Sequence, residues 1–518
     1  MFNFKNRAVD FFGNVDNRDV VSAISNFPIL EGLNSHKLSY LQALATIETI
    51  SEKLNFKDLV YSNAPNSFKI DVLLSVSDHL LTAKFPADKK SALVAQLITT
   101  SKHLRVHDST KEALIICDLI SRKQAVISPE DRIENQYQIC KIIWDRDMKD
   151  RAVFELQRLV TNIAITQHHS VRFHLTLAKW KHTRNAEGIQ SLVDNHIMPT
   201  ITAIQNSNQS ELKAKSFKHL ADYSFSLVEE SKDVEMIEAY KKIIEQKSKE
   251  LAALEGKNTR EDSIARSNKQ RQINADKALV KELQKRQESA LINALIGYIK
   301  ALRHSNKYDW TVFRLVSLLF KYENFEGLSD LKTHFFKIPA HKFVTVAHQL
   351  SAHIVCESKN LSEIIDKTLY QMNMLHPYHT FWHIVAIMKN TVGRNSNITR
   401  SATQLVDRLR AGNPNLFNKL IFLSDAYMEI ADLKPPSKDG RDIPRNCRFL
   451  KRDAFRNVPI ITDQFDVRAD ANYSELPYIA KVEAKYRLVG GINAPKLVSV
   501  TDNSGVTHLQ VSPSFCFC

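Results

Sequence analysis

Apolar residues recur at helical spacing through most of the chain. The run LVSLLFKY (residues 315–322) places its apolar side chains at i, i+3, i+4 and i+7, the pattern of a helix with one buried face. Residues 152–165, 277–302 and 401–410 show similar patterns. Helix after helix with short polar breaks predicts an α-solenoid of stacked helical pairs, whose repeats are degenerate because no strict repeat signature is present.

Proline usage divides the chain near residue 434. No proline lies between Pro199 and Pro339, whereas seven of the fifteen prolines follow Lys434. Because proline breaks both helices and central strands, we expect long helices up to residue 434 and a different structure after it. Residues 435–470 begin with many turn-forming residues and are predicted to be a connector.

The end of the chain has the pattern of a β-sheet. Residues 480–489 alternate apolar and charged side chains, which predicts a half-buried strand. A glycine pair then turns the chain, residues 497–501 form a second strand, and the turn DNSG (502–505) leads to a third at 506–510. The predicted fold is mainly α: a helical-repeat solenoid over 1–434, a connector over 435–470 and a fragmentary β-sheet over 471–510.

Composition excludes two classes of protein. Of the 518 residues, 43% are hydrophobic and 25% are charged, and no apolar run approaches the roughly 20 residues that span a bilayer. The first residues lack the apolar stretch of a signal peptide, so we expect neither a membrane nor a secreted protein. The six cysteines form no disulfide framework or zinc pattern, which favours a reducing compartment.

The net charge of +14 is spread along the chain and indicates a basic helical surface rather than a nucleic-acid site. Residues 241–290 carry 13 basic and 8 acidic side chains. A solvated connection between helices is the favoured interpretation of this segment, with a nucleic-acid-binding arm or a long exposed helix as alternatives. No aromatic residues interleave in its middle, which argues against single-strand binding.

Two features could carry chemistry. The pair Gly490 and Gly491, between two predicted strands, suits a loop whose backbone N–H groups cover nucleotide phosphates, but taken alone it is better interpreted as an ordinary hairpin turn. The run HPYHTFWH places His379 and His383 four residues apart, as in helical metal sites. Thr380 stands where a metalloprotease motif needs Glu, so we interpret His376, His379 and His383 as packing or capping residues and predict no metal site.

Four runs carry a family resemblance: ALIGYIKALRHSNKYDWTVFRLVSLLF, KIPAHKFVTVAHQLSAHI, LHPYHTFWHIVAI and YRLVGGINAPKLVSVTDNSG. In this order and spacing, residues 291–510 resemble the FAT region and kinase N-lobe of the ATM/Tel-type phosphatidylinositol-3-kinase-related protein kinases. The motifs KIP-x-x-KF, HP-x-HT and GG-x-N-x-PK are the specific part of the match. Residues 1–290 are similar to the preceding FAT helices only in their general helical pattern and contain no motif that is specific by itself.

The resemblance implies a nuclear serine/threonine protein kinase that signals DNA double-strand breaks and supports telomere maintenance. Its FAT-type solenoid would brace the kinase domain and contribute to a homodimer. Implied partners are protein substrates and DNA-damage sensor proteins, with no direct DNA binding and no membrane. The ATP-phosphate loop would comprise the following residues: Gly490, Gly491, Ile492, Asn493, Ala494, Pro495 and Lys496.

The chain departs from the family after Gln510. Val511, Ser512 and Pro513 stand where the family has Leu-Val-Lys, whose lysine pairs with the ATP phosphates. The catalytic-loop and metal-binding aspartates do not occur either, so we expect no catalytic residue here, no stable binding of ATP or Mg²⁺, and no kinase activity from this polypeptide. GTAAGT, a splice-donor sequence, encodes Val-Ser, and we interpret residues 511–518 as an aberrant tail of translated intron.

Two other functions remain open. A non-catalytic helical-repeat scaffold or dimerisation module would bind protein partners through the solenoid. A direct nucleic-acid binder would depend on the positive charge and on residues 241–290, and its affinity would fall steeply with salt.

Overall fold

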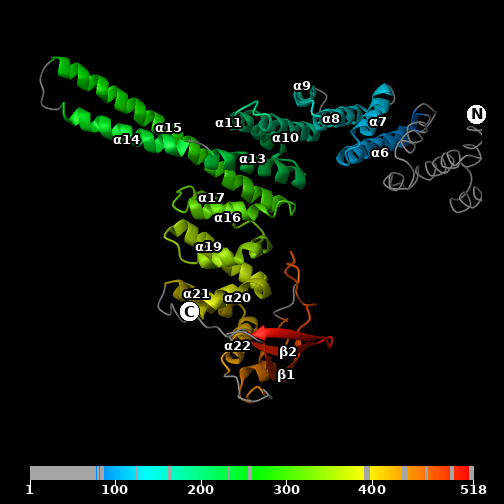
Figure 1. The fold of residues 1–518 in the computed structure, drawn as a ribbon, viewed down its shortest axis with the longest axis vertical. Helices are drawn as coiled ribbons and strands as arrows, with labels where there is room; N and C mark the ends of the chain where they lie inside the picture. Colours follow the sequence, from blue (N-terminus) through cyan, green and yellow to red (C-terminus); the bar gives the residue numbers. More distant parts are fainter. Residues whose placement is uncertain are drawn as a thin grey trace, which may run out of the picture. The chain divides into compact units, whose positions relative to one another are not determined.

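The computed structural model describes residues 77–78, 81, 87–123, 127–161, 166–230, 233–254, 260–389, 397–433, 442–460, 465–489 and 495–512. The chain divides into two compact units, Met1–Ser207 and Asn208–Cys518, which are described separately (Figure 1). No helix among the described residues is long and apolar enough to cross a membrane.

The first unit is helical wherever it is described. Its elements are α6 (Ala87–Val106), α7 (Thr110–Arg122), α8 (Pro129–Asp145), α9 (Lys149–Val160), α10 (Gln167–Thr183), α11 (Ile189–Leu192), the π-helix η3 (Val193–Ile197) and α12 (Met198–Ile204). From α6 to α10, each helix packs against the next along the chain. This neighbour-to-neighbour packing is what the predicted solenoid requires.

N-cap residues in the sequence fix where two of these helices begin. Ser128 accepts a hydrogen bond from the Asp131 backbone N–H, and Pro129 occupies the first helical position of α8. Thr166 caps α10 in the same way through the His169 N–H. Between α8 and α10, Trp144 stacks on Trp180 at 4.6 Å between ring centroids, which closes the core of this unit.

The second unit continues with helices as far as Ala431. They are α13 (Ser210–Glu230), α14 (Asp233–Ala252), α15 (Arg260–His304), α16 (Thr311–Lys321), α17 (Leu328–Phe335), the 3-10 helix η4 (Ala340–Val346), α18 (Ala347–Ala352), α19 (Lys359–Leu375), α20 (Pro377–Met388), α21 (Asn397–Gly412) and α22 (Pro414–Ala431). The 3-10 helices η5 (Arg448–Leu450) and η6 (Arg452–Phe455) follow. Helices predicted from periodicity, such as the one around residues 315–322, are confirmed.

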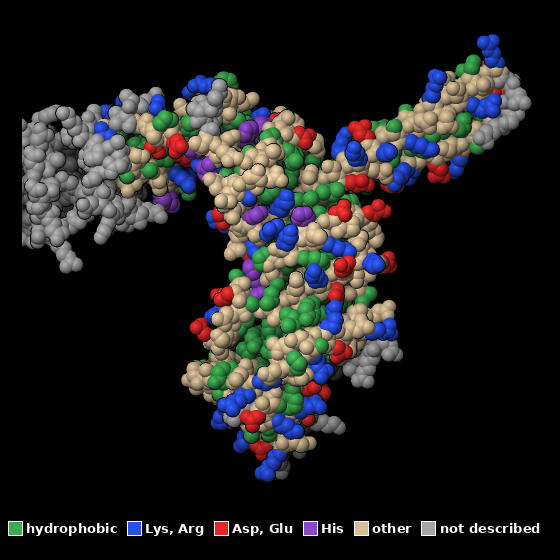
Figure 2. Space-filling model, turned by 180° about the vertical axis from the view of Figure 1, so that it is seen from behind, with side chains coloured by type: hydrophobic (Ala, Val, Ile, Leu, Met, Phe, Trp, Pro, Cys, Tyr) green, Lys and Arg blue, Asp and Glu red, His purple; other side chains and the backbone are tan. Residues whose placement is uncertain are grey.

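In the charged segment 241–290, residues 241–252 and 260–290 are helical rather than a solvated connection. They belong to α14 and to the first part of α15, which lie side by side as a long antiparallel pair (Figure 1). Ile237 of α14 packs against Val280 and Leu283 of α15. Lys and Arg side chains are distributed over the surface of this helical pair (Figure 2). The apolar contacts are sparse, which is why the sequence favoured a loop here.

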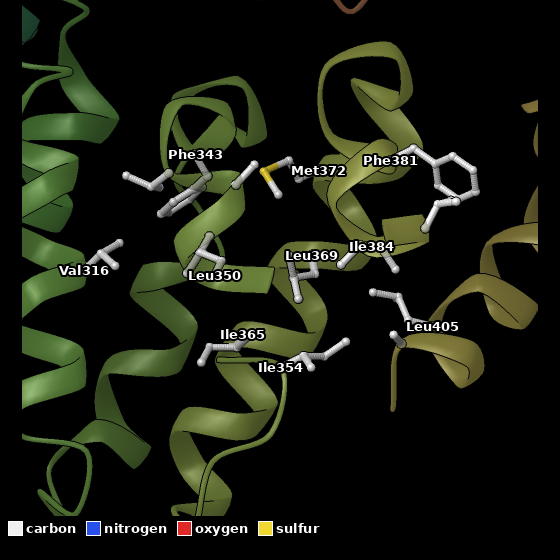
Figure 3. Close-up of a cluster of buried hydrophobic side chains, with 14 of the residues drawn as sticks. Val316, Phe343, Leu350, Ile354, Ile365, Leu369, Met372, Phe381, Ile384 and Leu405 are labelled. Atoms are coloured by element: carbon white, nitrogen blue, oxygen red, sulfur yellow. The ribbon is translucent and has the colours of Figure 1, made fainter. Parts of the chain in front are cut away.

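One continuous core joins α13 to the sheet. Its central part lies between η4, α18, α19, α20 and α21, where Phe343, Leu369 and Ile384 belong to one cluster (Figure 3). All three side chains are buried. Further along the same core lie Phe449 and Phe455 of η5 and η6, and Val498 and Val500 of the sheet. The sheet is therefore an extension of the helical core.

The sheet is antiparallel with the order β1-β2-β3. Its strands are β1 (Ile479–Leu488), β2 (Lys496–Asp502) and β3 (Thr507–Ser512). The predicted alternation along β1 is only partly right, because a register irregularity between Val482 and Tyr486 leaves Ala484 exposed while Tyr486 is buried. Ala484 uses its carbonyl oxygen to accept from the Ile443 N–H instead.

The third strand ends later than we expected. Val511 and Ser512 were predicted to interrupt the third strand, but they pair with Leu497 and Lys496 of β2 as regular members of β3. The remaining tail, 513–518, lies outside the described residues. The strand therefore continues through the point where the sequence departs from the family.

The close approach of α15 to α13 at Gly297 supplies a test of this packing. A Cβ atom at Gly297 of α15 would lie 2.7 Å from the Phe217 carbonyl oxygen and 2.8 Å from the Ala221 Cβ of α13. We expect Gly297→Ala to lower the free energy of unfolding by about 1–3 kcal/mol, because backbone atoms cannot yield as a side chain would. Chemical denaturation measures this.

Gly188→Ala is the matched control, because a Cβ atom there meets nothing within 4 Å. Its effect should stay below about 1 kcal/mol. A Gly297→Ala variant as stable as the parent would contradict the described contact between α13 and α15.

Candidate nucleotide-binding site

The ends of the glycine loop are fixed by the sheet. β1 and β2 pair as a hairpin, and the Val489 N–H donates to the Pro495 carbonyl oxygen at 2.8 Å, directly beside the loop. Of the predicted phosphate-loop residues, Pro495 and Lys496 are described. The others, Gly490, Gly491, Ile492, Asn493 and Ala494, lie outside the described residues. The structure thus supplies the frame of the loop, that is, the two paired strands and the Val489–Pro495 hydrogen bond that hold its ends.

Lys496 points into the helical support. It begins β2, only 3% of its surface is exposed, and its Nζ donates to the Ala431 carbonyl oxygen at 2.5 Å. Ala431 is the last residue of α22, where carbonyl groups lack intrahelical partners and the helix dipole is negative. In this structure the Lys496 ammonium therefore joins the loop frame to α22.

The third strand rests on the same helix. The Tyr427 hydroxyl of α22 donates to Oε1 of Gln510, and the Ser512 hydroxyl donates to the Tyr427 carbonyl oxygen at 2.9 Å. Gln510 and Ser512 are buried, whereas Leu509 and Val511, on the opposite face of β3, are more than half exposed. One face of the sheet is thus fixed to α22 and the other is open.

The DNSG turn is held by one carboxylate. The Asp502 side chain accepts from the Ser504 hydroxyl at 2.6 Å, from the Val506 N–H at 2.9 Å and from Nε2 of His508 at 2.9 Å. The Ser504 and His508 bonds hold the pKa of Asp502 well below its usual range. Gly505 adopts a φ of +87°, which favours glycine. The predicted turn residues therefore act structurally.

Two of the three candidate histidines connect α20 to the segment before β1. Nδ1 of His376 lies 2.7 Å from the Tyr473 hydroxyl, and Nε2 of His379 lies 3.2 Å from the Phe465 carbonyl oxygen. Burial, with the nearby His341 and His379, lowers the pKa of His376 to about 4. We assign the Tyr473 O–H as donor to a neutral His376.

His383 is separate from this pair. Its ring lies 6.2 Å from that of His348, and burial together with His348 lowers its pKa. The three imidazoles thus make packing contacts. Among the described residues, no group of three or more His, Cys, Asp or Glu side chains is placed to hold a metal ion.

The KIP-x-x-KF motif contains a second buried lysine, whose role sequence reasoning missed. Lys342 donates to the carbonyl oxygens of Leu302 at 2.6 Å and Ser305 at 2.8 Å, and its Nζ lies 2.9 Å from the Asp309 carboxylate. Only 4% of its surface is exposed. The motif therefore closes the C-terminal end of α15. Sequence spacing gave no signal of these partners, which lie more than 30 residues away.

Comparisons with known proteins agree with the predicted resemblance. A family profile described as "Serine/threonine-protein kinase ATR-like, HEAT repeats" matches residues 327–424. The chain is 22% identical over 464 residues to the serine/threonine-protein kinase tel1 of Schizosaccharomyces pombe, covering 85% of this chain and 16% of that protein. It is 23% identical over 377 residues to the serine/threonine-protein kinase ATM of Arabidopsis thaliana, covering 65% of this chain and 10% of that one.

Solved structures show the same fold. The open conformation of CtTel1 matches with a TM-score of 0.79 and 16% identity, covering 93% of this chain and 20% of that one. A structure of the FAT and kinase domain of CtTel1 matches with a TM-score of 0.77 and 17% identity, covering 93% of this chain and 36% of that one. The chain thus spans a small part of its relatives' length, and its resemblance to the ATM/Tel-type kinases is confirmed.

The neutral His376 predicts a pH dependence of stability. Its pKa of about 4 in the folded chain lies below the 6.5 of an ordinary histidine, so the unfolded chain binds more protons between these values. Stability should therefore fall as the pH is lowered from 7 to 5, by about 2 kcal/mol from this residue. Thermal unfolding of the parent and of His376→Gln across this range measures the contribution.

The glutamine variant should show the shallower pH dependence, while the other buried histidines contribute equally to both proteins. Parallel curves for the two proteins would contradict the assignment of a neutral His376 bonded to Tyr473.

Proposed function

We propose that this chain provides the helical support and the phosphate-covering hairpin of an ATM-type serine/threonine protein kinase. The observation that carries the proposal is the β1–β2 hairpin, tied by the bond from Val489 to Pro495 and mounted on α22 through Lys496. Between these ends the sequence has Gly490 and Gly491, which place no side chain between backbone N–H groups and a phosphate. Such a loop covers the phosphates in protein kinases.

The whole protein would transfer the γ-phosphoryl group of ATP, with Mg²⁺, to serine or threonine of protein substrates. It would act in the nucleus, in the response to DNA double-strand breaks and in telomere maintenance, together with DNA-damage sensor proteins. The names of two relatives, serine/threonine-protein kinase tel1 and serine/threonine-protein kinase ATM, support the kinase part of this proposal. Homodimerisation is part of the proposal, and it is supported by a solved structure titled as a complete CtTel1 dimer.

This polypeptide itself should not catalyse the reaction. Pro513 stands where the resemblance requires the lysine that pairs with ATP phosphates, and a proline side chain offers neither charge nor a donor. Charge neutralisation by lysine and Mg²⁺ is the main catalytic contribution in phosphoryl transfer. The chain would therefore help to position the ATP phosphates but would not catalyse phosphoryl transfer.

A second candidate is a non-catalytic scaffold or dimerisation module. The observation that favours it is the same Pro513. Without the phosphate-binding lysine the chain lacks a group that kinase chemistry needs, whereas its helical surfaces could still bind protein partners. The two candidates differ in nucleotide binding: a phosphate-covering loop retains a weak affinity for ATP, whereas a scaffold has none.

Fluorescent ATP-analogue titration of the purified chain, with Mg²⁺ present, separates these candidates. We expect weak but saturable binding, with a Kd above about 100 μM, that is lost in Gly491→Val because the side chain blocks the approach of phosphate. No phosphate should appear in a protein substrate incubated with the chain and ATP.

Gly505→Val is the matched control. It strains the DNSG turn at a positive φ but lies at the other end of β2, so ATP binding should persist. Binding that is absent from the parent, or equal in Gly491→Val, would contradict the loop assignment and favour the scaffold. Phosphorylated substrate would contradict the predicted inactivity.

A further inference from the structure

A hollow in the second unit is lined by aromatic rings and carboxylates. It lies between α15 and the turn that follows α16, and its volume is about 390 Å³. Three half-buried rings form most of its apolar wall: Phe320, Tyr322 and Phe325. Leu291 of α15, which is buried, also lines it. The volume lies at the lower end of the range for ligand pockets, so the hollow can hold a side chain of a partner.

The aromatic wall is fixed by contacts within the chain. The Phe325 N–H donates to the Tyr322 carbonyl oxygen at 3.0 Å, which closes a tight turn. The Phe325 ring packs on Gly327, where an added Cβ atom would lie 2.5 Å from two ring carbons. The Phe320 ring stacks on that of His353, with 3.8 Å between the centroids. Both phenylalanine rings are therefore held in place, which lowers the entropic cost of binding a ligand.

Two carboxylates of the hollow have no cation bound to them. Within the described part of the chain, neither Glu288 of α15 nor Glu323 of the turn forms an ion pair. Lys321, which also lines the hollow, donates to both carboxylate oxygens of Glu229, at 2.8 and 2.9 Å. Burial, together with the charge of Glu323, raises the pKa of the Cys356 thiol. The hollow therefore carries an excess of negative charge.

We propose that this hollow, here called the aromatic–acidic pocket, binds an arginine side chain of a protein partner. A guanidinium group is planar, so it can stack on aromatic rings while its N–H groups donate to carboxylates. The negative charge of the pocket selects a cation. The apolar wall selects a cation with an aliphatic stem, because such stems bury well against apolar surface. The pocket is independent of the glycine loop and of the proposed kinase role.

The rim of the pocket favours a peptide over a free amine. Gln287 and Asn324 line the pocket with side-chain amides that make no hydrogen bond to the described residues. An amide side chain both donates and accepts, so it can bond the backbone of an extended peptide. A single cation at a partly exposed site is bound weakly, and such flanking contacts add to the affinity. Arginine is also enriched among the residues that anchor protein interfaces in pockets.

Saturation-transfer NMR with a seven-residue peptide tests the proposal on the full chain. The peptide has one central arginine among glycine, serine and alanine, and its matched form has neutral citrulline at that place. We expect saturable binding of the arginine peptide with a Kd on the order of 1 mM, and binding at least about tenfold weaker for the citrulline peptide. Glu323→Gln should weaken the arginine peptide at least about fivefold, through the loss of a charged acceptor.

Glu261→Gln is the matched control. Glu261 is an exposed glutamate at the other end of α15 that forms no ion pair with the described residues, and its removal changes the net charge equally. Its affinity for the arginine peptide should stay within about twofold of the parent, as expected for a screened surface charge. Thermal unfolding scans verify that both variants fold. No binding by the parent, equal affinity for the citrulline peptide, or equal loss in Glu261→Gln and Glu323→Gln would overturn the proposal.

Gly327→Ala tests the aromatic wall without changing any charge. Its Cβ atom would displace the Phe325 ring, so the arginine peptide should bind at least about threefold more weakly. Unchanged affinity in a folded Gly327→Ala chain would overturn the role of this ring. Putrescine tests the alternative of a free amine. It should bind more weakly than the arginine peptide, and tighter binding of putrescine would overturn the assignment to a protein partner.

Discussion

The sheet and its glycine loop depend on one buried ammonium group. The Lys496 Nζ reaches the Ala431 carbonyl oxygen at the end of α22 in a place where water has almost no access. A buried cation without a partner costs several kcal/mol, so this contact cannot be given up cheaply. It fixes the first residue of β2 against the helix. Because β1 and β3 pair with β2 on either side, this contact positions the sheet together with the Tyr427 bonds of β3 and the buried Val498 and Val500.

The same arrangement occurs earlier in the chain. Lys342 binds the carbonyl oxygens of Leu302 and Ser305 at the end of α15, as Lys496 binds that of Ala431 at the end of α22. In both places an ammonium group satisfies helix-terminal carbonyls whose partial charge is negative. The two lysines belong to the motifs KIP-x-x-KF and GG-x-N-x-PK, which carry the family resemblance. In both motifs, a buried lysine therefore joins the end of a helix to a neighbouring segment.

Periodicity predicted most helices and all three strands, because it reports which face of an element is buried. It failed over the first part of α15, where contact with α14 depends on few apolar positions, Val280 and Leu283 among them. It also ended β3 too early, since the burial of Ser512 depends on a hydrogen bond to the distant Tyr427. The partners of Lys496 and His376 lie 65 and 97 residues away, so no local pattern could reveal them.

Hydrogen exchange of the parent and of Lys496→Met tests most directly whether the sheet depends on α22. Loss of the ammonium should speed exchange across β1, β2 and β3 by at least about tenfold, while α16 exchanges as before. Lys485→Met, which removes an exposed lysine of β1, should leave both regions unchanged. Unchanged protection of the sheet in Lys496→Met would contradict the account, because the strands would then hold their place without this contact.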